Sequence, residues 1–337
     1  MADLKTTYAG LKLINPIIVG ASILSSNADN FKRIEDAGAA AIVYKSLFEE
    51  QVQLERLELE EGLTEYNERH AEMITLFPDV EHAGPSEHLM NLRLAKESVN
   101  IPVIASLNCV FAPTWIEYAK LIQDTGVDAL ELNFFYIPRN SKLDGKTIIE
   151  QQIEILKEIK KVITIPVTIK LSPFYTNPLN VIMSMDIAGA DGFVLFNRFL
   201  QPDIDPEYEI HINHFSASSP EENLLPMKFA GLLYGNTQAS VCANTGIHSG
   251  RDVAKMLLAG ADCVQIVSTL YKNKISYLTT MISDLDQWMD SKGYKSILDF
   301  KGKLSQKKVN DPFIYKRAQY IDILSKSSDI FKKYPLH

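Results

Sequence analysis

Short apolar runs recur along this chain, and most are separated by segments in which apolar residues repeat at helical spacing. Eight of these runs have the length and composition of β-strands. They are residues 17–22, 40–45, 103–108, 129–133, 167–171, 192–197, 239–244 and 263–267. Strands that alternate with helices predict a parallel sheet, and eight such repeats predict an α/β fold of the (β/α)8, or TIM, barrel type.

Helix ends and helix starts are also legible in the sequence. Four strands are preceded by a glycine that follows a helical segment, a position where glycine accepts the left-handed backbone that ends many helices. These glycines are Gly38, Gly126, Gly189 and Gly260. Helix starts are predicted at Asn177-Pro178 and at Ser219-Pro220, where a capping side chain precedes a first-turn proline.

Each of the eight apolar runs finishes at or next to a polar or charged side chain. These residues are Ser22, Lys45, Asn108, Asn133, Lys170, Asn197, Asn244 and Ser268. Such groups are costly to bury inside a barrel but line the active site at its C-terminal mouth. Strand caps would account for one or two of them. Eight together indicate a bound ligand.

The last two strands and the helix between them occupy residues 239–270. Polar turns follow both strands: the first strand stops at Asn244-Thr245-Gly246, and the second at Ser268-Thr269. The backbone N–H groups that could bind a ligand are those of residues 246–249 and 268–270. Backbone N–H groups at helix starts favour anions, and barrels of this type often hold a phosphate here. We therefore expect these turns to bind a phosphorylated cofactor; the alternative is a pair of ordinary βα turns.

Lys45 and Lys170 end otherwise apolar strands, where an unpaired ammonium group is costly unless an anion lies nearby. A flavin gathers negative charge at one edge of its ring on reduction, and Lys170 suits the stabilisation of that charge. Two alternatives stay open. The lysines could form ion pairs with Glu131 in a neighbouring strand, or one could be the Schiff-base nucleophile of an aldolase or lyase.

Asn133 and Asn197 end the fourth and sixth strands. Their amides donate and accept hydrogen bonds together, which fits a planar imide or amide ring in a substrate. They could equally be turn residues, because asparagine often follows a strand.

The length of 337 residues suits one barrel domain with insertions over its C-terminal mouth. We expect a single domain over residues 1–337, with insertions at about residues 46–100, 134–146 and 198–219. Long loops at these positions commonly act as lids or substrate walls.

Composition narrows the class of protein. The chain is 46% hydrophobic and 23% charged, and its net charge of −8 argues against nonspecific binding to nucleic acid or anionic membranes. Three cysteines in apolar surroundings predict reduced thiols, with no disulfide framework and no metal site. No apolar run reaches membrane-spanning length and the N-terminus lacks a signal-peptide pattern, so we expect a cytoplasmic protein.

Several motifs resemble one known family nearly from end to end. The matching pieces are NPIIVGAS (15–22), YKS (44–46), ELN (131–133), IKLSP (169–173), FN (196–197), NTGIHSGRDVAKMLLAGAD (244–262), QIVSTL (265–270) and GYKSILDFKGKL (293–304). In these motifs the chain is similar to class 1 dihydroorotate dehydrogenases, cytosolic FMN-dependent (β/α)8 barrels. The C-terminal motif is among the most telling, because no catalytic need dictates it.

The resemblance implies roles for individual residues. Lys45 would lie by the flavin and the substrate, Lys170 would lie on the flavin, and Asn133 and Asn197 would bind the pyrimidine. The expected cofactor-binding set is Ala21, Ser22, Lys45, Ser46, Asn108, Asn133, Lys170, Asn197, Asn244, Thr245, Gly246, Ser268 and Thr269.

The chain departs from the family in the substrate half of the site. The family has a Cys or Ser after ELN that removes a substrate proton, whereas this chain reads Phe134-Phe135-Tyr136. Tyr136 stands about where the base should be, so the expected catalytic set is Lys45, Lys170 and Tyr136. A tyrosine is a base only if its pKa is strongly lowered, and it is more often an aromatic wall.

The resemblance implies oxidation of (S)-dihydroorotate to orotate in pyrimidine biosynthesis, with hydride transfer to flavin N5. A second acceptor, either fumarate, NAD or another compound, would reoxidise the flavin, and the protein would be a homodimer. Two alternatives keep FMN: a different substrate, or a flavin-binding protein that is catalytically impaired because it lacks the family's base.

Overall fold

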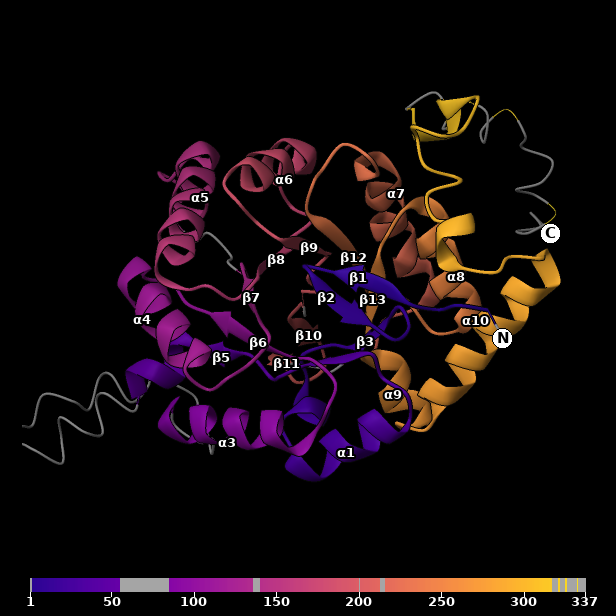
Figure 1. Cartoon of the computed structure of the whole chain (residues 1–337). Coiled ribbons are helices and arrows are strands. Elements are labelled where there is room, and N and C mark those ends of the chain that lie inside the picture. The colour runs from indigo at the N-terminus through magenta and orange to yellow at the C-terminus, as the bar shows by residue number, and fades with distance from the viewer. Residues whose placement is uncertain are drawn as a thin grey trace, which may run out of the picture.

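The computed structural model describes residues 2–54, 85–135, 140–199, 201–212 and 216–316, together with residues 321, 325 and 332. Eight parallel strands close into a barrel that helices surround (Figure 1). The order around the barrel is β4, β3, β13, β12, β9, β8, β7 and β6, and β6 pairs with β4 to complete the ring. The predicted (β/α)8 barrel is confirmed.

The barrel strands lie within the eight predicted apolar runs. They are β3 (Ile17–Val19), β4 (Ala41–Val43), β6 (Val103–Asn108), β7 (Ala129–Asn133), β8 (Val167–Leu171), β9 (Gly192–Leu195), β12 (Ser240–Asn244) and β13 (Cys263–Ile266). Strands β3, β4 and β9 end two residues or more before the predicted ends. Ser22, Lys45 and Asn197 therefore lie in the loops that leave the sheet, where their side chains are freer to face a ligand.

Helices follow the strands and cover the outside of the barrel. They are α1 (Ala28–Asp36), α3 (Pro85–Ser98), α4 (Ala112–Gln123), α5 (Gly145–Val162), α6 (Pro178–Ile187), α7 (Leu224–Leu233), α8 (Gly250–Ala259), α9 (Ser268–Asn273) and α10 (Tyr277–Lys292). The glycines that end four of the connections have positive φ, as predicted. Within the described ranges, none of the helices combines the length and the apolar character needed to cross a membrane.

The two predicted helix starts differ in outcome. The Asn177 side chain accepts a hydrogen bond from the N–H of Asn180 and caps α6, as expected. Pro220 instead begins a short 3-10 helix (Pro220–Asn223) that leads into α7, and the side chain of Ser219 makes no capping hydrogen bond. The prediction of a side-chain cap at Ser219 was wrong.

The N-terminal end of the barrel is closed by the hairpin of β1 (Thr6–Tyr8) and β2 (Leu11–Leu13), which lies across the centre of the ring in Figure 1. Tyr8 is fully buried and packs with the small and branched side chains that fill the barrel. The Ala9 N–H donates to Ser240 Oγ at the start of β12. Only the C-terminal end is therefore left for a ligand.

A repeated Gly-x-Asp turn fixes the strands at this closed end. Three aspartates, each directly before a strand, accept the N–H at or near the start of the adjacent strand and also pair with a lysine. The pairs are Asp128 with Val103 and Lys96, Asp191 with Val167 and Lys160, and Asp262 with Val241 and Lys301. Each aspartate-to-backbone distance is 2.7 Å. These bonds hold the register of neighbouring strands.

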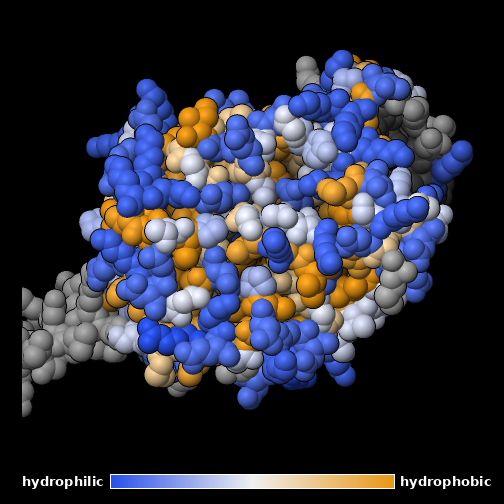
Figure 2. All heavy atoms as spheres, in the orientation of Figure 1, coloured by the Kyte–Doolittle hydropathy of each residue, from blue (hydrophilic) through white to orange (hydrophobic). Residues whose placement is uncertain are grey.

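Additional short elements lie in the predicted insertions. Strand β5 (Leu47–Phe48) pairs with β6, and β10 (Asp203–Asp205) pairs with β11 (Ile210–Ile212) as a hairpin. On the face shown in Figure 2, hydrophilic residues cover most of the outer helices and hydrophobic residues appear between them. Scattered apolar residues of this kind are ordinary on a protein surface.

Candidate active site

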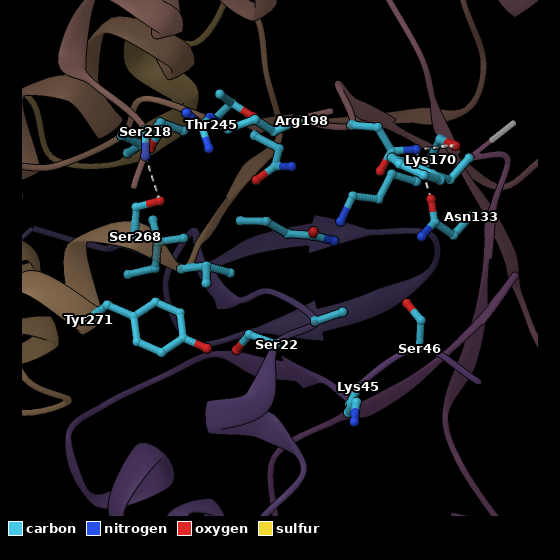
Figure 3. A pocket seen from close by; sticks show the side chains of 18 of the residues that line it. Ser22, Lys45, Ser46, Asn133, Lys170, Arg198, Ser218, Thr245, Ser268 and Tyr271 are labelled. Atoms are coloured by element: carbon cyan, nitrogen blue, oxygen red, sulfur yellow. Dashed lines mark hydrogen bonds between the residues drawn. The ribbon is translucent and has the colours of Figure 1, made fainter. Parts of the chain in front are cut away.

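A cavity of about 470 Å³ opens at the C-terminal end of the barrel. Seven of the eight predicted strand-end residues line it: Ser22, Lys45, Asn133, Lys170, Asn197, Asn244 and Ser268. Ala21, Ser46, Thr245 and Gly246 line it as well. In Figure 3, Lys170 and Asn133 lie on one side of the cavity, and Ser218 and Ser268 lie on the other. The structure thus brings together, at one cavity, predicted residues from seven strand ends.

Two predicted residues do not line the cavity. Asn108 is buried behind it, and its Nδ2 donates to the backbone oxygens of Asn133 (2.6 Å) and Phe135 (3.2 Å). It therefore supports the loop after β7. Thr269 is fully buried, and its hydroxyl donates to the backbone oxygen of His248.

Lys170 projects from the end of β8 beside a buried carboxylate. Its Nζ lies 3.6 Å from Oε1 of Glu131, which is completely buried in β7. The ion pair that the sequence left as an alternative for Lys170 is present. For Lys45, no carboxylate lies within ion-pair distance among the described residues. Lys45 therefore contributes a positive charge to the cavity that can pair with an anionic group of a ligand.

The amide groups of Asn133 and Asn197 are joined. Nδ2 of Asn197 donates to Oδ1 of Asn133 at 2.7 Å, and both residues are buried. This bond fixes which face each amide turns to the cavity, because Oδ1 of Asn133 must accept. Nδ2 of Asn133 is then left to donate to a ligand, and Oδ1 of Asn197 is left to accept from it.

Next to Lys45, the side chain of His88 is buried and packs edge-on against Tyr44. Burial, together with the smaller effect of the charge of Lys45, lowers the pKa of His88 to about 4. Histidine is thus neutral at this position, and the positive charge at this side of the cavity belongs to Lys45.

The opposite side of the cavity is formed by the turn after β12. A Cβ atom on Gly246, which has φ +72°, would lie 2.4 Å from the backbone nitrogen of Asn223, so only glycine fits. The hydroxyl of Ser218 accepts from the Gly246 N–H at 3.3 Å, and the Ser218 N–H donates to Ser268 Oγ at 3.0 Å. Ser249 caps α8. The hydroxyl of Ser249 is bound to Asp252, away from the cavity. The lining residues Ser218, Thr245 and Ser268 present their hydroxyls to an anionic group at the start of α9.

Several lining residues were not predicted from the sequence. They are Phe135, Arg198, Ser216, Ser218, Gln265 and Tyr271, with others of the same loops. Arg198 donates from Nε to Glu222 at 2.8 Å and also binds the backbone of Ser216. Its position directly after Asn197 could have suggested it. Gln265 gave no signal, because it lies in the middle of an apolar strand.

The loop after β7 begins with aromatic side chains. Phe135 stacks on Phe199 with ring centroids 4.4 Å apart, and Phe134 packs against Trp115. Tyr136, the predicted base, lies outside the described residues. Phe135, stacked on Phe199, therefore forms an aromatic wall on this side of the cavity, whereas Phe134 is buried behind it.

The geometry defines what the cavity can bind. Three cations line it, namely Lys45, Lys170 and Arg198, and no acidic side chain does so among the described residues. The hydroxyl of Ser22 and Oε1 of Gln265 are buried, with no hydrogen-bond partner there. Buried polar atoms without partners are uncommon and call for an explanation. An anionic ligand with several donors would provide one.

Comparison with known proteins agrees with this geometry. The family model described as dihydroorotate dehydrogenase matches residues 82–289. The catalytic subunit of dihydroorotate dehydrogenase B (NAD(+)) from Thermoplasma acidophilum is 28% identical over 319 residues, covering 90% of this chain and 99% of that protein. Proteins with the same name from Thermoplasma volcanium (29% identical, 90% of this chain and 98% of the relative) and Methanocaldococcus jannaschii (26%, 80% and 87%) also match.

Proposed function

The chain belongs to the dihydroorotate dehydrogenase family, and from this premise we propose that it oxidises (S)-dihydroorotate to orotate with FMN as its cofactor. Membership of the family makes it a flavin-dependent dehydrogenase that acts on a CH–CH bond. The observation that carries the proposal is the cavity at the C-terminal end, where two lysines, two paired asparagines and a glycine turn meet.

The residues present fit FMN. The turn from Thr245 to Ile247 after β12 and Ser268 at the start of α9 line the cavity and would supply amides and hydroxyls for a phosphate. Together with Ser22, Lys170 and the unpartnered Oε1 of Gln265, these groups would hold the phosphate, the ribityl chain and the ring of FMN.

When bound, FMN supplies a hydride acceptor at N5. The protein's own groups do the rest. Lys170 would stabilise the negative charge that FMN gains on reduction, since a fixed ammonium in a buried site requires no reorganisation during the reaction. Asn133 and Asn197 orient a planar imide through their amides, and Lys45 faces the carboxylate of the substrate. Tyr136 is the proposed proton acceptor.

The test begins with the visible spectrum of the purified protein, with FMN added if it is colourless. Anaerobic mixing with (S)-dihydroorotate should bleach the flavin absorbance within minutes. Dihydrouracil, which lacks the carboxylate, serves as the control and should bleach it far more slowly. A protein that binds FMN but stays oxidised with dihydroorotate would refute this substrate.

A second candidate keeps FMN and changes the substrate. It is favoured by Phe134 and Phe135, which stand where the family has a polar loop with its Cys or Ser base. Under this proposal the aromatic wall selects a different reduced ring. Anaerobic bleaching by another cyclic amide, in protein that dihydroorotate leaves oxidised, would identify it.

The names of the relatives bear on the electron acceptor. Each is a catalytic subunit of an NAD-dependent enzyme. We propose that this chain also passes its electrons to a partner subunit, and that it forms a homodimer. Slow reoxidation of the isolated protein by NAD, and fast reoxidation by NAD in a complex purified from the source, would support this assignment.

A further inference from the structure

A chain of buried polar groups crosses the barrel just beneath the cavity. Ser46 and Ser106 share a hydrogen bond of 2.7 Å, Ser106 Oγ donates to Glu131 Oε1 at 3.4 Å, and Gln265 Nε2 donates to Glu131 Oε2 at 2.7 Å. Strands β7 and β13 stand four places apart in a ring of eight, so Glu131 and Gln265 meet across the barrel axis. Ser106 and Glu131 are completely buried, and Gln265 is 1% exposed.

This arrangement is costly if it serves packing alone. A buried carboxylate loses its hydration, and one ion pair with Lys170 at 3.6 Å recovers only part of that free energy. An apolar core would fill the same space without the penalty. The hydroxyl of Ser106 and the amide of Gln265 compensate the charge, yet they are themselves buried polar groups.

The carboxylate also decides how the amide of Gln265 is turned. A carboxylate accepts hydrogen bonds only, so Nε2 must face Glu131 and Oε1 must face the other way. That oxygen is buried and has no hydrogen-bond partner among the described residues. Gln265 lines the cavity, and Oε1 is its one polar side-chain atom left for a ligand.

We propose that Gln265 is a further cofactor-contacting residue, whose Oε1 accepts a hydrogen bond from FMN, and that Glu131 is the positioning residue that turns this amide and offsets the charge of Lys170. The inference rests on the proposed binding of FMN. It gives Glu131 a function that a simple ion pair with Lys170 does not require, namely control of the electrostatic potential at the ring.

Two variants separate the two parts. Glu131→Gln keeps the shape and a hydrogen-bond acceptor for Gln265 but removes the charge that offsets Lys170. The reduced cofactor carries more negative charge than the oxidised one. In Glu131→Gln its binding should therefore tighten about tenfold relative to that of the oxidised form, which raises the midpoint potential of the two-electron couple by about 30 mV. Gln265→Met keeps the volume and removes the acceptor, so the dissociation constant for FMN should rise about tenfold.

The readouts are the midpoint potential, measured by reductive titration against a reference dye, and the FMN dissociation constant, measured by fluorescence quenching. Glu49→Gln is the matched control. Glu49 is a buried carboxylate, 3% exposed, that accepts hydrogen bonds from Thr114 and the Val110 N–H and does not line the cavity. It should lower the melting temperature without changing the potential or the FMN affinity.

The outcomes are distinguishable. Wild-type protein that fails to bind FMN overturns the proposed function and this inference with it. Wild-type protein that binds FMN, with variants whose potential and affinity match the Glu49→Gln control, overturns this inference alone. If Glu131→Gln does not fold, the affinity of Gln265→Met decides: a tenfold weaker complex supports the contact, and an unchanged one overturns it.

Discussion

At the N-terminal end of the barrel, Asp128, Asp191 and Asp262 each bind a backbone N–H and a lysine, whereas at the C-terminal end Ser22 and Gln265 keep buried oxygens without partners among the described residues. Both ends place polar groups against the same apolar barrel. At the closed end the aspartates, lysines and backbone N–H groups satisfy one another, and the hydroxyls of Tyr8 and Thr168, which lack partners among the described residues, are enclosed in the packed core rather than lining the cavity. At the open end the unpartnered oxygens of Ser22 and Gln265 belong to residues that line the cavity, where a ligand can bind them.

The difference shows how one fold separates stability from function. Register bonds at the closed end do not change when the ligand changes, so the loops of the open end can vary. This chain departs from the family there, with aromatic residues directly after β7 where the family has a Cys or Ser. We therefore expect substitutions at the open end to change rates and affinities, and substitutions at the closed end to change the free energy of unfolding.

The largest effect is expected at Lys170. In Lys170→Met, the edge of the ring loses its fixed positive charge and Glu131 is left buried without its ion-pair partner. Reduction of the flavin by substrate should slow by about 10² to 10³-fold, as for removal of one preorganised electrostatic group. Stopped-flow absorbance under anaerobic conditions measures it. Lys146→Met, at an exposed lysine in α5, should leave the rate unchanged; equal rates in both variants would contradict the role of Lys170.

His88, at the open end, is an exception to this division, because protonation of its buried ring is expected to change the free energy of unfolding. Burial lowers its pKa to about 4, from 6.5 in a model peptide, so the unfolded chain binds more protons between these values. The free energy of unfolding should therefore fall as the pH falls from 6.5 to 4, by about 3 kcal/mol in total. Urea unfolding at several pH values measures it.

His88→Phe should remove most of this dependence. A phenyl ring keeps the edge-on contact with Tyr44, and Nε2 of His88 has no hydrogen-bond partner to lose among the described residues. The free energies of unfolding of the variant and the wild-type protein should then differ more at pH 4 than at pH 7. Parallel curves for the two proteins would show that His88 is not the titrating group.

The comparison of the two ends also explains what the sequence could predict. The alternation of apolar runs and helical segments located all eight strands, because each strand is buried on both sides and reads as a continuous apolar run. The polar ends of those runs identified most of the cavity, since the C-terminal ends of barrel strands always meet at one mouth. These features depend on the position of a residue within its own strand.

Other features depend on which strand stands opposite. The bond between Gln265 and Glu131 joins strands on opposite sides of the ring, and no local pattern in either strand predicts it. Ser218 is close to Gly246 only because the long loop after β9 folds back over the mouth. The strand ends at Ser22 and Lys45 were predicted too late for a different reason, because the apolar run continues after the backbone has left the sheet at Val19 and at Val43.

At the closed end, Asp191→Ala should lower the free energy of unfolding by about 2 kcal/mol, since it leaves the Val167 N–H and Lys160 without their acceptor. Lys160→Met breaks only the ion pair and should cost about 0.5 kcal/mol. Urea unfolding of both variants gives the values. Neither should change the affinity for FMN. A loss of affinity in Asp191→Ala would mean that the two ends are coupled.

A tenfold effect is expected for Asn197→Ala, and it separates substrate binding from cofactor binding within the open end. The variant removes the donor to Oδ1 of Asn133, so that amide is free to turn and the planar imide loses one of its partners. We expect the KM for the substrate to rise about tenfold, the value of one good hydrogen bond in a buried site, with a smaller change in FMN affinity. Steady-state kinetics and flavin fluorescence measure the two quantities. Asn236→Ala, at an exposed asparagine that caps its own helix end, is the control. If FMN affinity falls as much as substrate affinity, the asparagine pair belongs to the cofactor, and the boundary between the two halves of the cavity must be moved toward the loop after β7.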